Sequence, residues 1–337
     1  MNPDENPIAS SRMRREAARR LGIEIESLDP GTGYLLELRR GGRRRILVHG
    51  PSPLNDAGAS RLAGDKYYTS LVLQRAGFPV PRGTRCLQPG TYQVSDFSEY
   101  TGLETARSFA AEEGFPVVVK PNRGSRGRGV AVAADEEELE EAVREVWQDD
   151  PLALVLELIP GTDRRLDFLD GEFLYGYDRR PVVLEGDGRS TLRELLAGWD
   201  RRFTGADFER RLLHDPLWRR SVVRLGFGLD TPLEKGRRIE LSGDILNLNR
   251  FCVARYLPDP PQEWIDLGLR IGAALHLRHF GIDFRRRTLD GAPEEAPEKA
   301  VVLEVNASPS LGQSYEMGYV EETVAAEMRV LEALMGD

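Results

Sequence analysis

Short apolar runs alternate with amphipathic segments along this chain, and the alternation predicts mixed helix and strand structure. Three runs are predicted as buried strands: FPVVVKP (115–121), VAVAA (130–134) and LALVLEL (152–158). Between the second and third runs, Asp135 precedes Glu138 at the spacing of a helix-capping box, which predicts a helix over 136–147.

Turn residues between other apolar runs predict two hairpins. Asp170-Gly171 separates RRLDFL from EFLYGYD, and Asp-Gly is a strong signal for a two-residue hairpin turn. Gly41-Gly42 lies in the same way between YLLEL and ILVHG. Strands paired in hairpins beside helices favour an α+β fold over a single parallel sheet.

The remaining apolar periodicities complete the predicted elements. Helices are expected over 65–76, closed by Gly77, from Ser190 onward, over 262–280, and from about Glu321 to the end of the chain. Two further strands, GIDFRRR (281–287) and AVVLEVNAS (300–308), are separated by the polar stretch 288–299.

The charge balance argues against nucleic acid as the main partner. The chain of 337 residues has a formal net charge of −9. Two arginine-dense patches oppose this balance: Arg12, Arg14, Arg15, Arg19 and Arg20, and then Arg39, Arg40, Arg43, Arg44 and Arg45. The second patch is interpreted as a solvated charged turn, with a site that attracts an acidic substrate as the alternative.

Cysteine usage and hydropathy bear on the compartment. Cys86 and Cys252 stand alone, without a paired motif, which fits a reducing cytoplasm. The polar start has no apolar core of a signal peptide, and no run approaches the roughly 20 apolar residues that span a bilayer. We therefore expect a soluble cytoplasmic protein that binds neither membrane nor nucleic acid.

A glycine-rich loop follows the lysine that ends the first predicted strand. Lys120 directly precedes this loop, which runs from Asn122 to Gly129. Glycines allow backbone N–H groups to approach phosphate oxygens, and a lysine adds a positive charge. The loop joins two strands and is not a Walker A loop; an ordinary β-turn remains the alternative.

Oxygen-bearing side chains are concentrated on the last two predicted strands. Asp283 lies on one strand, and Glu304 and Asn306 share a face of the next. Two carboxylates and an amide oxygen are hard ligands that suit Mg²⁺. A salt bridge from a carboxylate to an arginine such as Arg285 is the alternative.

Asp163 and Arg165 also share a strand face by their spacing. The carboxylate could accept hydrogen bonds from ribose hydroxyls, and the guanidinium could contact reacting groups. An ion pair on the protein surface explains the same spacing.

Seven segments, in this order, resemble the ATP-grasp superfamily, and most closely the ATP-grasp portion of cyanophycin synthetase-like ligases. They are DKYYTSLVLQRAGFPVP, FPVVVKPNRGSRGRGV, LVLELIPGTDRRL, RRPVVLEGDGRSTLREL, LGFGLDTPLEKG, DILNLNR, and GIDF followed by VVLEVNASPSL. The resemblance covers most of the chain from about Ala17 onward. Its most specific motifs are GDG-x-x-T-x-x-E-L and L-D-T-P-x-x-x-G.

This resemblance implies roles for particular residues. The ATP-binding positions are Lys66 and Lys120 for the phosphates, Gly124, Ser125, Arg126 and Gly127 in the lid loop, Glu157, Leu158 and Ile159 in the adenine hinge, and Asp163 for the ribose. The arginines near the transferred phosphoryl group are Arg165, Arg179 and Arg250. The ligands of two Mg²⁺ ions are Asp283, Glu304 and Asn306.

The resemblance also implies an architecture. It predicts an ATP-grasp fold with an N-terminal subdomain over 1–90, a lid subdomain over 91–160, and a C-terminal subdomain with an antiparallel sheet and the metal site over 161–337. A homodimer and a homotetramer both stay open.

The implied activity is an ADP-forming ligase that joins a carboxylate to an amine through an acyl phosphate. Its cofactors are ATP and Mg²⁺, with Mn²⁺ as a substitute, and its substrates are a small carboxylate and an amine from amino acids or peptides. The alternatives are an accessory or regulatory nucleotide-binding protein, and a ligase with an acceptor other than an amine.

The chain departs from the family pattern at three places. The hinge glutamate of the family falls at Leu156, whereas this chain has Glu157, so the adenine contact is expected to shift by one residue. Phe251 and Cys252 stand where the family usually has two glycines, which leaves the acceptor in doubt. The chain stops before the Mur-ligase-like module of cyanophycin synthetase, so synthesis of a two-component polymer is not expected.

Overall fold

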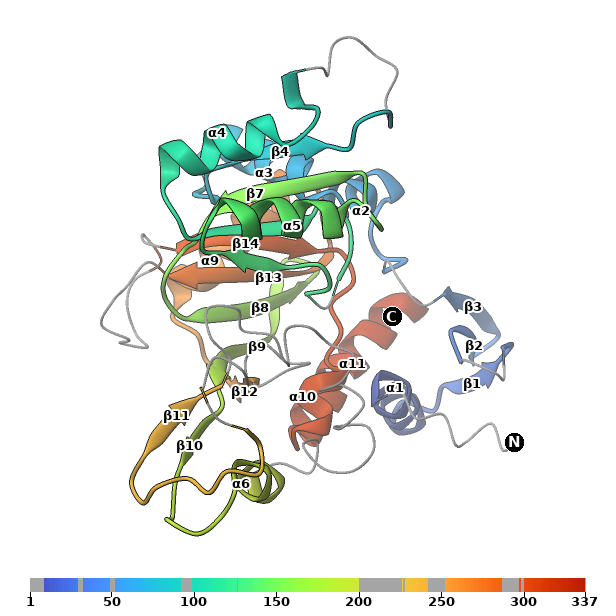
Figure 1. Ribbon diagram of the computed structural model, residues 1–337. Helices are drawn as coiled ribbons and strands as arrows, with labels where there is room; N and C mark the ends of the chain where they lie inside the picture. Colours follow the sequence, from blue (N-terminus) through green and yellow to red (C-terminus); the bar gives the residue numbers. More distant parts are fainter. Residues whose placement is uncertain are drawn as a thin grey trace. The chain divides into compact units, whose positions relative to one another are not determined.

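The structure is a computed structural model, and its elements are shown in Figure 1. It describes residues 9–29, 33–48, 52–91, 99–125, 127–199, 226, 228–241, 252–286, 297 and 300–336. These residues fall into two compact units, one formed by 1–178 with 254–337 and the other by 179–253. The predicted division at residues 90 and 160 concerns smaller subdomains and stays a prediction.

A five-stranded sheet in the order β12-β9-β8-β13-β14 carries the predicted C-terminal strands. Its strands are β8 (Asp163–Leu169), β9 (Glu172–Pro181), β12 (Cys252–Tyr256), β13 (His279–Arg286) and β14 (Ala300–Asn306). The Asp170-Gly171 turn joins β8 to β9, with φ of 49° and 83°, so the predicted hairpin is confirmed. Alternation along β8, β13 and β14 gives this sheet two different faces.

One face of this sheet packs in an apolar core beneath three helices. The helices are α2 (Ala57–Ala63), α3 (Lys66–Arg75) and α9 (Gln262–Ala274). Phe168, Ile282 and Phe284 point into this core, where Trp264 of α9 packs edge-on against Phe284. Burying each such side chain contributes about 1.5–3 kcal/mol. The core therefore fixes which residues of β8 and β13 lie on the opposite face.

A four-stranded antiparallel sheet follows the order β4-β7-β5-β6. Its elements are β4 (Gly83–Leu87), α4 (Glu104–Glu113), β5 (Val117–Pro121), β6 (Ala131–Ala133), α5 (Glu136–Val146) and β7 (Leu152–Glu157). The predicted capping box is confirmed, because Asp135 Oδ1 accepts from Glu138 N at 2.9 Å and Glu138 Oε2 accepts from Ala134 N at 2.9 Å. Val117 and Val119 of β5 pack against α5, so Val118 and Lys120 face the other way.

The N-terminal elements pack with the C-terminal helices. They are α1 (Ala9–Arg20), β1 (Glu24–Ser27), β2 (Leu35–Arg40), β3 (Arg43–Val48), α10 (Gly312–Glu316) and α11 (Val320–Met335). Gly41 and Gly42, with φ of 55° and 78°, form the predicted turn between β2 and β3. Because α1 and α11 make many contacts, the two ends of the chain stabilise each other.

The arginine patches have partners within the fold. Arg43 Nη1 donates to the carbonyls of Met335 and Gly336, at 2.6 and 2.7 Å, at the end of α11. Arg44 donates to the buried carboxylate of Glu37 at 2.7 Å. In α1, Arg14 donates to Glu327 at 2.5 Å. Arg43 and Arg14 therefore hold the N-terminal sheet and α1 to α11, whereas Arg44 joins β3 to β2.

The second unit contains one of the motifs on which the family resemblance rests. It contains β10 (Val183–Glu185), α6 (Leu192–Trp199) and β11 (Arg238–Glu240). In the GDG-x-x-T-x-x-E-L segment, Asp187 accepts from the backbone N–H groups of Arg189 and Ser190, and Thr191 and Glu194 form a capping box at the start of α6. A Cβ on Gly186 would lie 2.2 Å from the carbonyl of Glu234. Within this unit the motif is a turn and a helix start.

The predicted helix over 262–280 is wrong at its end. Helix α9 stops at Ala274, His276 has a positive φ of 55°, and β13 begins at His279. The leucines of this segment are buried on both sides of the turn, so their spacing looked helical although the backbone changes direction.

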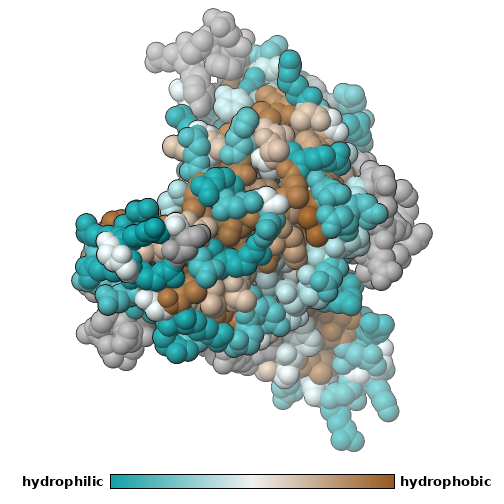
Figure 2. All heavy atoms as spheres, turned by 180° about the vertical axis from the view of Figure 1, so that it is seen from behind, coloured by the Kyte–Doolittle hydropathy of each residue, from teal (hydrophilic) through white to brown (hydrophobic). Residues whose placement is uncertain are grey.

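The described surface is mostly hydrophilic. On the face shown in Figure 2, hydrophobic side chains lie among hydrophilic ones. Nowhere in the part of the chain that the structure describes is a helix both long and apolar enough to cross a membrane.

Candidate functional site

Strand register brings the predicted metal ligands together on the face opposite the apolar core. Asp283 of β13 pairs with Arg165 of β8 on one side and with Glu304 of β14 on the other. Residues opposite each other on neighbouring strands share a face. A second row, in which Gly281 pairs with Asp167 and with Asn306, lies two residues along the strands.

Arg165 is buried between two carboxylates of this face. Its Nε lies 2.5 Å from Asp167 Oδ1, and its Nη1 lies 3.0 Å from Asp283 Oδ2. All three side chains are buried. Burial alone would disfavour the charged arginine, but Asp167 and Asp283 outweigh it and raise the pKa of Arg165 above its ordinary value. The expected surface pair of Asp163 with Arg165 is therefore not what the structure shows.

Asp283, Glu304 and Asn306 offer three oxygen donors that suit Mg²⁺. Asn306 Nδ2 donates to Asp283 Oδ2 at 3.2 Å, which leaves its carbonyl oxygen available to a cation. No group of three or more His, Cys, Asp or Glu residues within the described ranges is placed to hold a metal. The donor set fits a cation that takes its other ligands from water or phosphate.

The two predicted phosphate-binding lysines lie beside Glu304. Lys66 Nζ, at the start of α3, is 3.4 Å from Glu304 Oε1 and donates to the carbonyl of Gly124 at 3.0 Å. Lys120 Nζ donates to the carbonyl of Leu303 on β14 at 3.2 Å. Two lysines from separate elements therefore approach the same part of β14, and only Lys66 pairs directly with Glu304. This ion pair is partly solvated, because the side chain of Glu304 is 29% exposed.

The charged residues of this cluster also shift the pKa of Lys120. Removal from water lowers the pKa of Lys120 to about 8, and repulsion by Lys66 acts in the same direction. Glu304 and Asp283 oppose this shift. An anion of high charge, such as a triphosphate, would stabilise both ammonium groups.

The glycine-rich loop joins β5 to β6, as predicted. Gly124 and Gly127 have φ of 122° and 65°, which favour glycine. Arg128 N donates to the carbonyl of Ser125 at 3.3 Å. The link from Lys66 to Gly124 places the start of the loop beside the lysines. Arg126 lies outside the described residues.

The predicted adenine hinge follows β7. The buried Glu157 accepts from Arg82 N at 2.8 Å, so its carboxylate connects the end of β7 to the residue that precedes β4. The carbonyl of Ile159 accepts from Arg285 Nη1 at 3.1 Å, and Leu158 between them is half-buried. Backbone groups of this segment remain the expected contact for adenine.

Asp163, the predicted ribose ligand, is buried and paired with Arg285 across β8 and β13. Arg285 was the example given for a salt bridge to the predicted metal-binding carboxylates, but it pairs with Asp163, and Asp283 pairs with Arg165. Two predicted arginines remain, Arg179 in the second unit and Arg250. Arg179 lies half-buried near the end of β9, and Arg250 lies outside the described residues.

Two residues of the site escaped the sequence analysis, and a third, Asn122, was predicted only as the first residue of the loop. Asp167 holds Arg165, and the signal for it was its position two residues after Arg165 on the same strand. Gly281 leaves the space that this pair occupies. Asn122, which is 3% exposed, accepts from Tyr67 N at 2.8 Å and so ties the loop to the start of α3.

Comparison with known proteins identifies relatives of this chain. Residues 74–155 match the family described as carbamoyl-phosphate synthase L chain, ATP binding domain. The chain is 30% identical over 264 residues to cyanophycin synthetase of Geminocystis herdmanii, covering 74% of this chain and 28% of the relative. It is 25% identical over 319 residues to the glutathione biosynthesis bifunctional protein of Lactiplantibacillus plantarum, covering 90% of this chain and 40% of the relative.

A solved structure shows the same fold. The bifunctional glutathione synthetase from Pasteurella multocida matches with a TM-score of 0.60 at 20% identity, over 98% of this chain and 44% of that one. The chain thus spans less than half the length of each of these relatives.

Proposed function

From the premise that this chain belongs to the ATP-grasp superfamily, we propose that it is an ADP-forming carboxylate–amine ligase. It activates a carboxylate as an acyl phosphate and joins it to an amine. The substrates we propose are amino acids or short peptides, since peptide-bond-forming enzymes are among its relatives.

One observation carries this proposal: two lysines and two carboxylates from four elements meet at one point. Lys66 and Lys120 approach β14 at Glu304 and Leu303, while Asp283 lies next to Glu304 in the sheet register. Asp283 already pairs with Arg165, so the two lysines are left with the single carboxylate of Glu304. Two lysines beside one carboxylate leave a positive charge that suits a metal-bound triphosphate.

We assign the residues of the site separate roles in phosphoryl transfer. Lys66 and Lys120 bind the phosphate oxygens, and the loop that begins at Gly124 covers them. Mg²⁺ held by Asp283, Glu304 and Asn306 would neutralise charge on the phosphates. The substrate carboxylate oxygen forms a bond to the γ-phosphorus as the bond to ADP breaks.

Arg165 is a candidate for stabilising the charge of the transferred group. Its guanidinium is fixed by Asp167 and Asp283, so it needs little reorganisation when charge develops beside it. In the second step the amine nitrogen attacks the acyl carbon, phosphate leaves, and the nitrogen loses a proton. Because water also attacks an acyl phosphate, closure of the loop over it protects the intermediate.

The test is a screen of amino acids and dipeptides, singly and in pairs, for release of ADP and phosphate, with mass analysis of the product. We expect turnover only when an acid and an amine are both present. Turnover that yields AMP, or ADP release that never requires an amine, contradicts the proposal.

A matched pair of variants assigns that turnover to the site. Glu304→Gln is expected to lower turnover by about a hundredfold or more, the scale seen when a key electrostatic group is lost. Glu24→Gln, on an exposed position of β1, removes the same charge far from the cluster and should leave turnover unchanged.

A further inference from the structure

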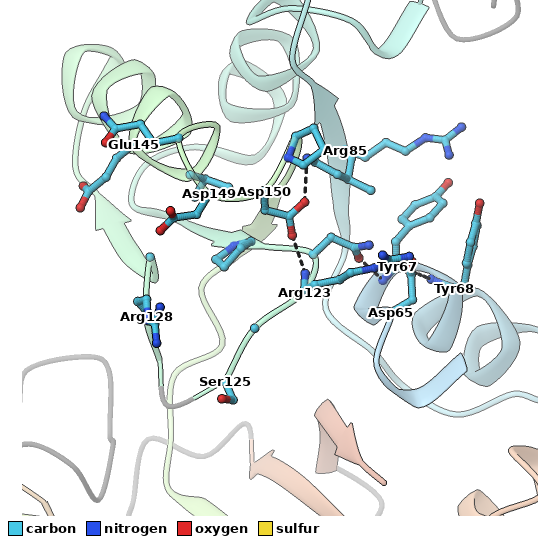
Figure 3. A pocket seen from close by; sticks show the side chains of 18 of the residues that line it. Asp65, Tyr67, Tyr68, Arg85, Arg123, Ser125, Arg128, Glu145, Asp149 and Asp150 are labelled. Carbon is cyan, nitrogen blue, oxygen red and sulfur yellow. Dashed lines mark hydrogen bonds and ion pairs between the residues drawn. The ribbon is translucent and has the colours of Figure 1, made fainter. Parts of the chain in front are cut away.

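A cavity of about 810 Å³ lies behind the glycine-rich loop (Figure 3). Its lining comes from the start of α3, from the loop itself, and from the segment between the end of α5 and β7, with Arg61 of α2 and Arg85 of β4. Lys66 and Lys120 are not among its lining residues, whereas their neighbours Tyr67 and Pro121 are. The cavity is therefore separate from the cluster around Glu304.

The cavity and that cluster lie on opposite sides of the same two segments. Lys120 and Pro121 are consecutive on β5, so their side chains point to opposite faces. Lys120 reaches Leu303, and Pro121 lines the cavity. In the same way Lys66 reaches Glu304 while Tyr67 and Tyr68 line the cavity.

Buried hydrogen bonds join the walls of the cavity into one structure. The carbonyl of Asn122 accepts from Lys66 N at 3.3 Å, and its side chain accepts from Tyr67 N at 2.8 Å. Asp150 accepts from Arg123 N at 2.6 Å and from Leu152 N at 3.0 Å. A ligand that shifts one wall therefore shifts the loop and the first turn of α3 together.

Acidic and basic side chains both line the cavity. Figure 3 shows Glu145 and Asp149, from the end of α5, on one side, with Arg128 on the same side. The other side carries Tyr67, Tyr68, Arg85 and Arg123, together with Asp65, which pairs with Arg123 at 3.6 Å. The lining therefore offers charges of both signs to a ligand.

Several of the lining charges are already engaged by the protein. Asp150 already accepts hydrogen bonds from two backbone N–H groups. Asp65 caps α3 by accepting from Tyr68 N at 3.0 Å. In contrast, Asp149 and Arg61 form no ion pair or side-chain hydrogen bond with any residue that the structure describes. The same is true of Arg128, so one anion and two cations of the described lining are left for a ligand.

We propose that this cavity binds a zwitterionic effector, a free amino acid or a short peptide. Its ammonium group faces Asp149 and Glu145, and its carboxylate faces Arg61 and Arg123. The volume is within the roughly 300–1,000 Å³ typical of small-molecule sites. A simple anion would instead meet the repulsion of the two acidic side chains.

Binding at this cavity changes the affinity for nucleotide, because the ligand contacts the segments that carry both lysines. This coupling rests on the proposed role of Lys66 and Lys120 in ATP binding, whereas the binding of the effector does not. The two parts are therefore tested separately.

The first measurement is calorimetry of the full chain without nucleotide, against the twenty free amino acids, dialanine and diglycine. We expect at least one compound to bind, and its N-acetyl and amide derivatives to bind at least tenfold more weakly. Arg61→Gln and Asp149→Asn should each weaken binding about tenfold. No binding by any compound overturns the proposal, as does binding that neither variant changes.

The two variants also separate a zwitterion from an anion. Both weaken the binding of a zwitterion, whereas Asp149→Asn would strengthen the binding of an anion by removing repulsion. Stronger binding in Asp149→Asn therefore overturns the zwitterionic assignment.

The second measurement is the affinity for Mg²⁺-ATP with and without the compound found in the first. We expect a shift of about fivefold or more, on the scale of typical allosteric coupling. Arg61→Gln should bind ATP like the wild type and lose the shift at the same compound concentration. Unchanged ATP affinity at saturating compound overturns the effector role. If the wild type binds no ATP, the proposed function fails, but the calorimetric result still stands.

Discussion

At the residue scale, Arg165 keeps its place because the neighbouring strand has no side chain at Gly281. A Cβ there would lie 2.0 Å from Asp167 Oδ1 and 2.1 Å from Arg165 Nη2. Both atoms belong to a buried ion pair. Glycine is therefore required at this position for space.

Gly281→Ala should displace Arg165 and so lower turnover by tenfold or more, together with a loss of stability of about 1–3 kcal/mol from overpacking. Steady-state kinetics and denaturant unfolding measure the two effects. Gly198→Ala is the control, since its Cβ meets nothing within 4 Å and it lies in α6. Wild-type turnover in Gly281→Ala would contradict the role given to Arg165.

His279 makes the stability of the fold depend on pH. It is buried, its Nδ1 lies 2.9 Å from Ser52 Oγ, and burial lowers its pKa to about 4, with Arg14 and Arg165 acting in the same direction. Below pH 6.5 the unfolded chain binds a proton at this histidine that the folded chain does not. Its contribution to stability is therefore complete above pH 6.5 and is lost as pH falls toward about 4.

Denaturant unfolding between pH 7 and pH 4 checks this expectation. The histidine should contribute a slope of up to about 1.4 kcal/mol per pH unit. Carboxylates titrate in the same range, so the comparison is with His279→Gln, whose slope should be smaller. Equal slopes in the two proteins would show that His279 is not protonated differently on unfolding.

At the element scale, Arg43 supplies a C-terminal cap for α11. Its guanidinium donates to the carbonyls of Met335 and Gly336, which have no later helical turn to bind them. The positive charge also interacts favourably with the helix dipole. Thus β3 secures the last helix of the chain.

Arg43→Gln should lower the free energy of unfolding by about 1–2 kcal/mol, the scale of a charged hydrogen bond with its dipole interaction. Denaturant unfolding at pH 7 measures it. Arg15→Gln is the matched control, because Arg15 on α1 forms no ion pair with any described residue. A loss no larger than that of the control would show that the cap does not stabilise α11.

Strands and caps were predictable at this scale because their signals are local. The Asp135–Glu138 box and the Asp170-Gly171 turn are read from a few neighbouring residues. The end of α9 was not predictable. The spacing of its leucines fits a continuous helix as well as it fits a turn that leads into a strand. The helix α1 was missed because its buried face consists of Met13 and small alanines within a basic segment.

Most residues of the candidate site were predicted, but not their pairings. Asp283 and Glu304 were predicted from strand spacing, Lys120 from its place before the loop and Lys66 from the family resemblance, but the partner of Asp283 depends on the register of β8 against β13. A shift of two residues would have paired it with another side chain on the same face. Register is set by the packing of the whole sheet, which no short segment encodes.

At the scale of the whole molecule, Lys120 links the four-stranded sheet to the five-stranded one. It extends from β5 to the carbonyl of Leu303 on β14, while Lys66 joins the loop to Glu304. Both contacts use groups that a nucleotide would occupy. ATP binding should therefore replace these direct links between the two sheets with links through phosphate.

The whole-molecule account depends on whether Lys120 binds a metal-bound triphosphate. Titration calorimetry with Mg²⁺ and a non-hydrolysable ATP analogue tests this most directly, on the wild type and on Lys120→Met, with Lys235→Met in the second unit as the charge-matched control. The account predicts binding by the wild type and by the control, and at least tenfold weaker binding by Lys120→Met. Equal affinity in the wild type and Lys120→Met, or no binding by the wild type, would contradict it.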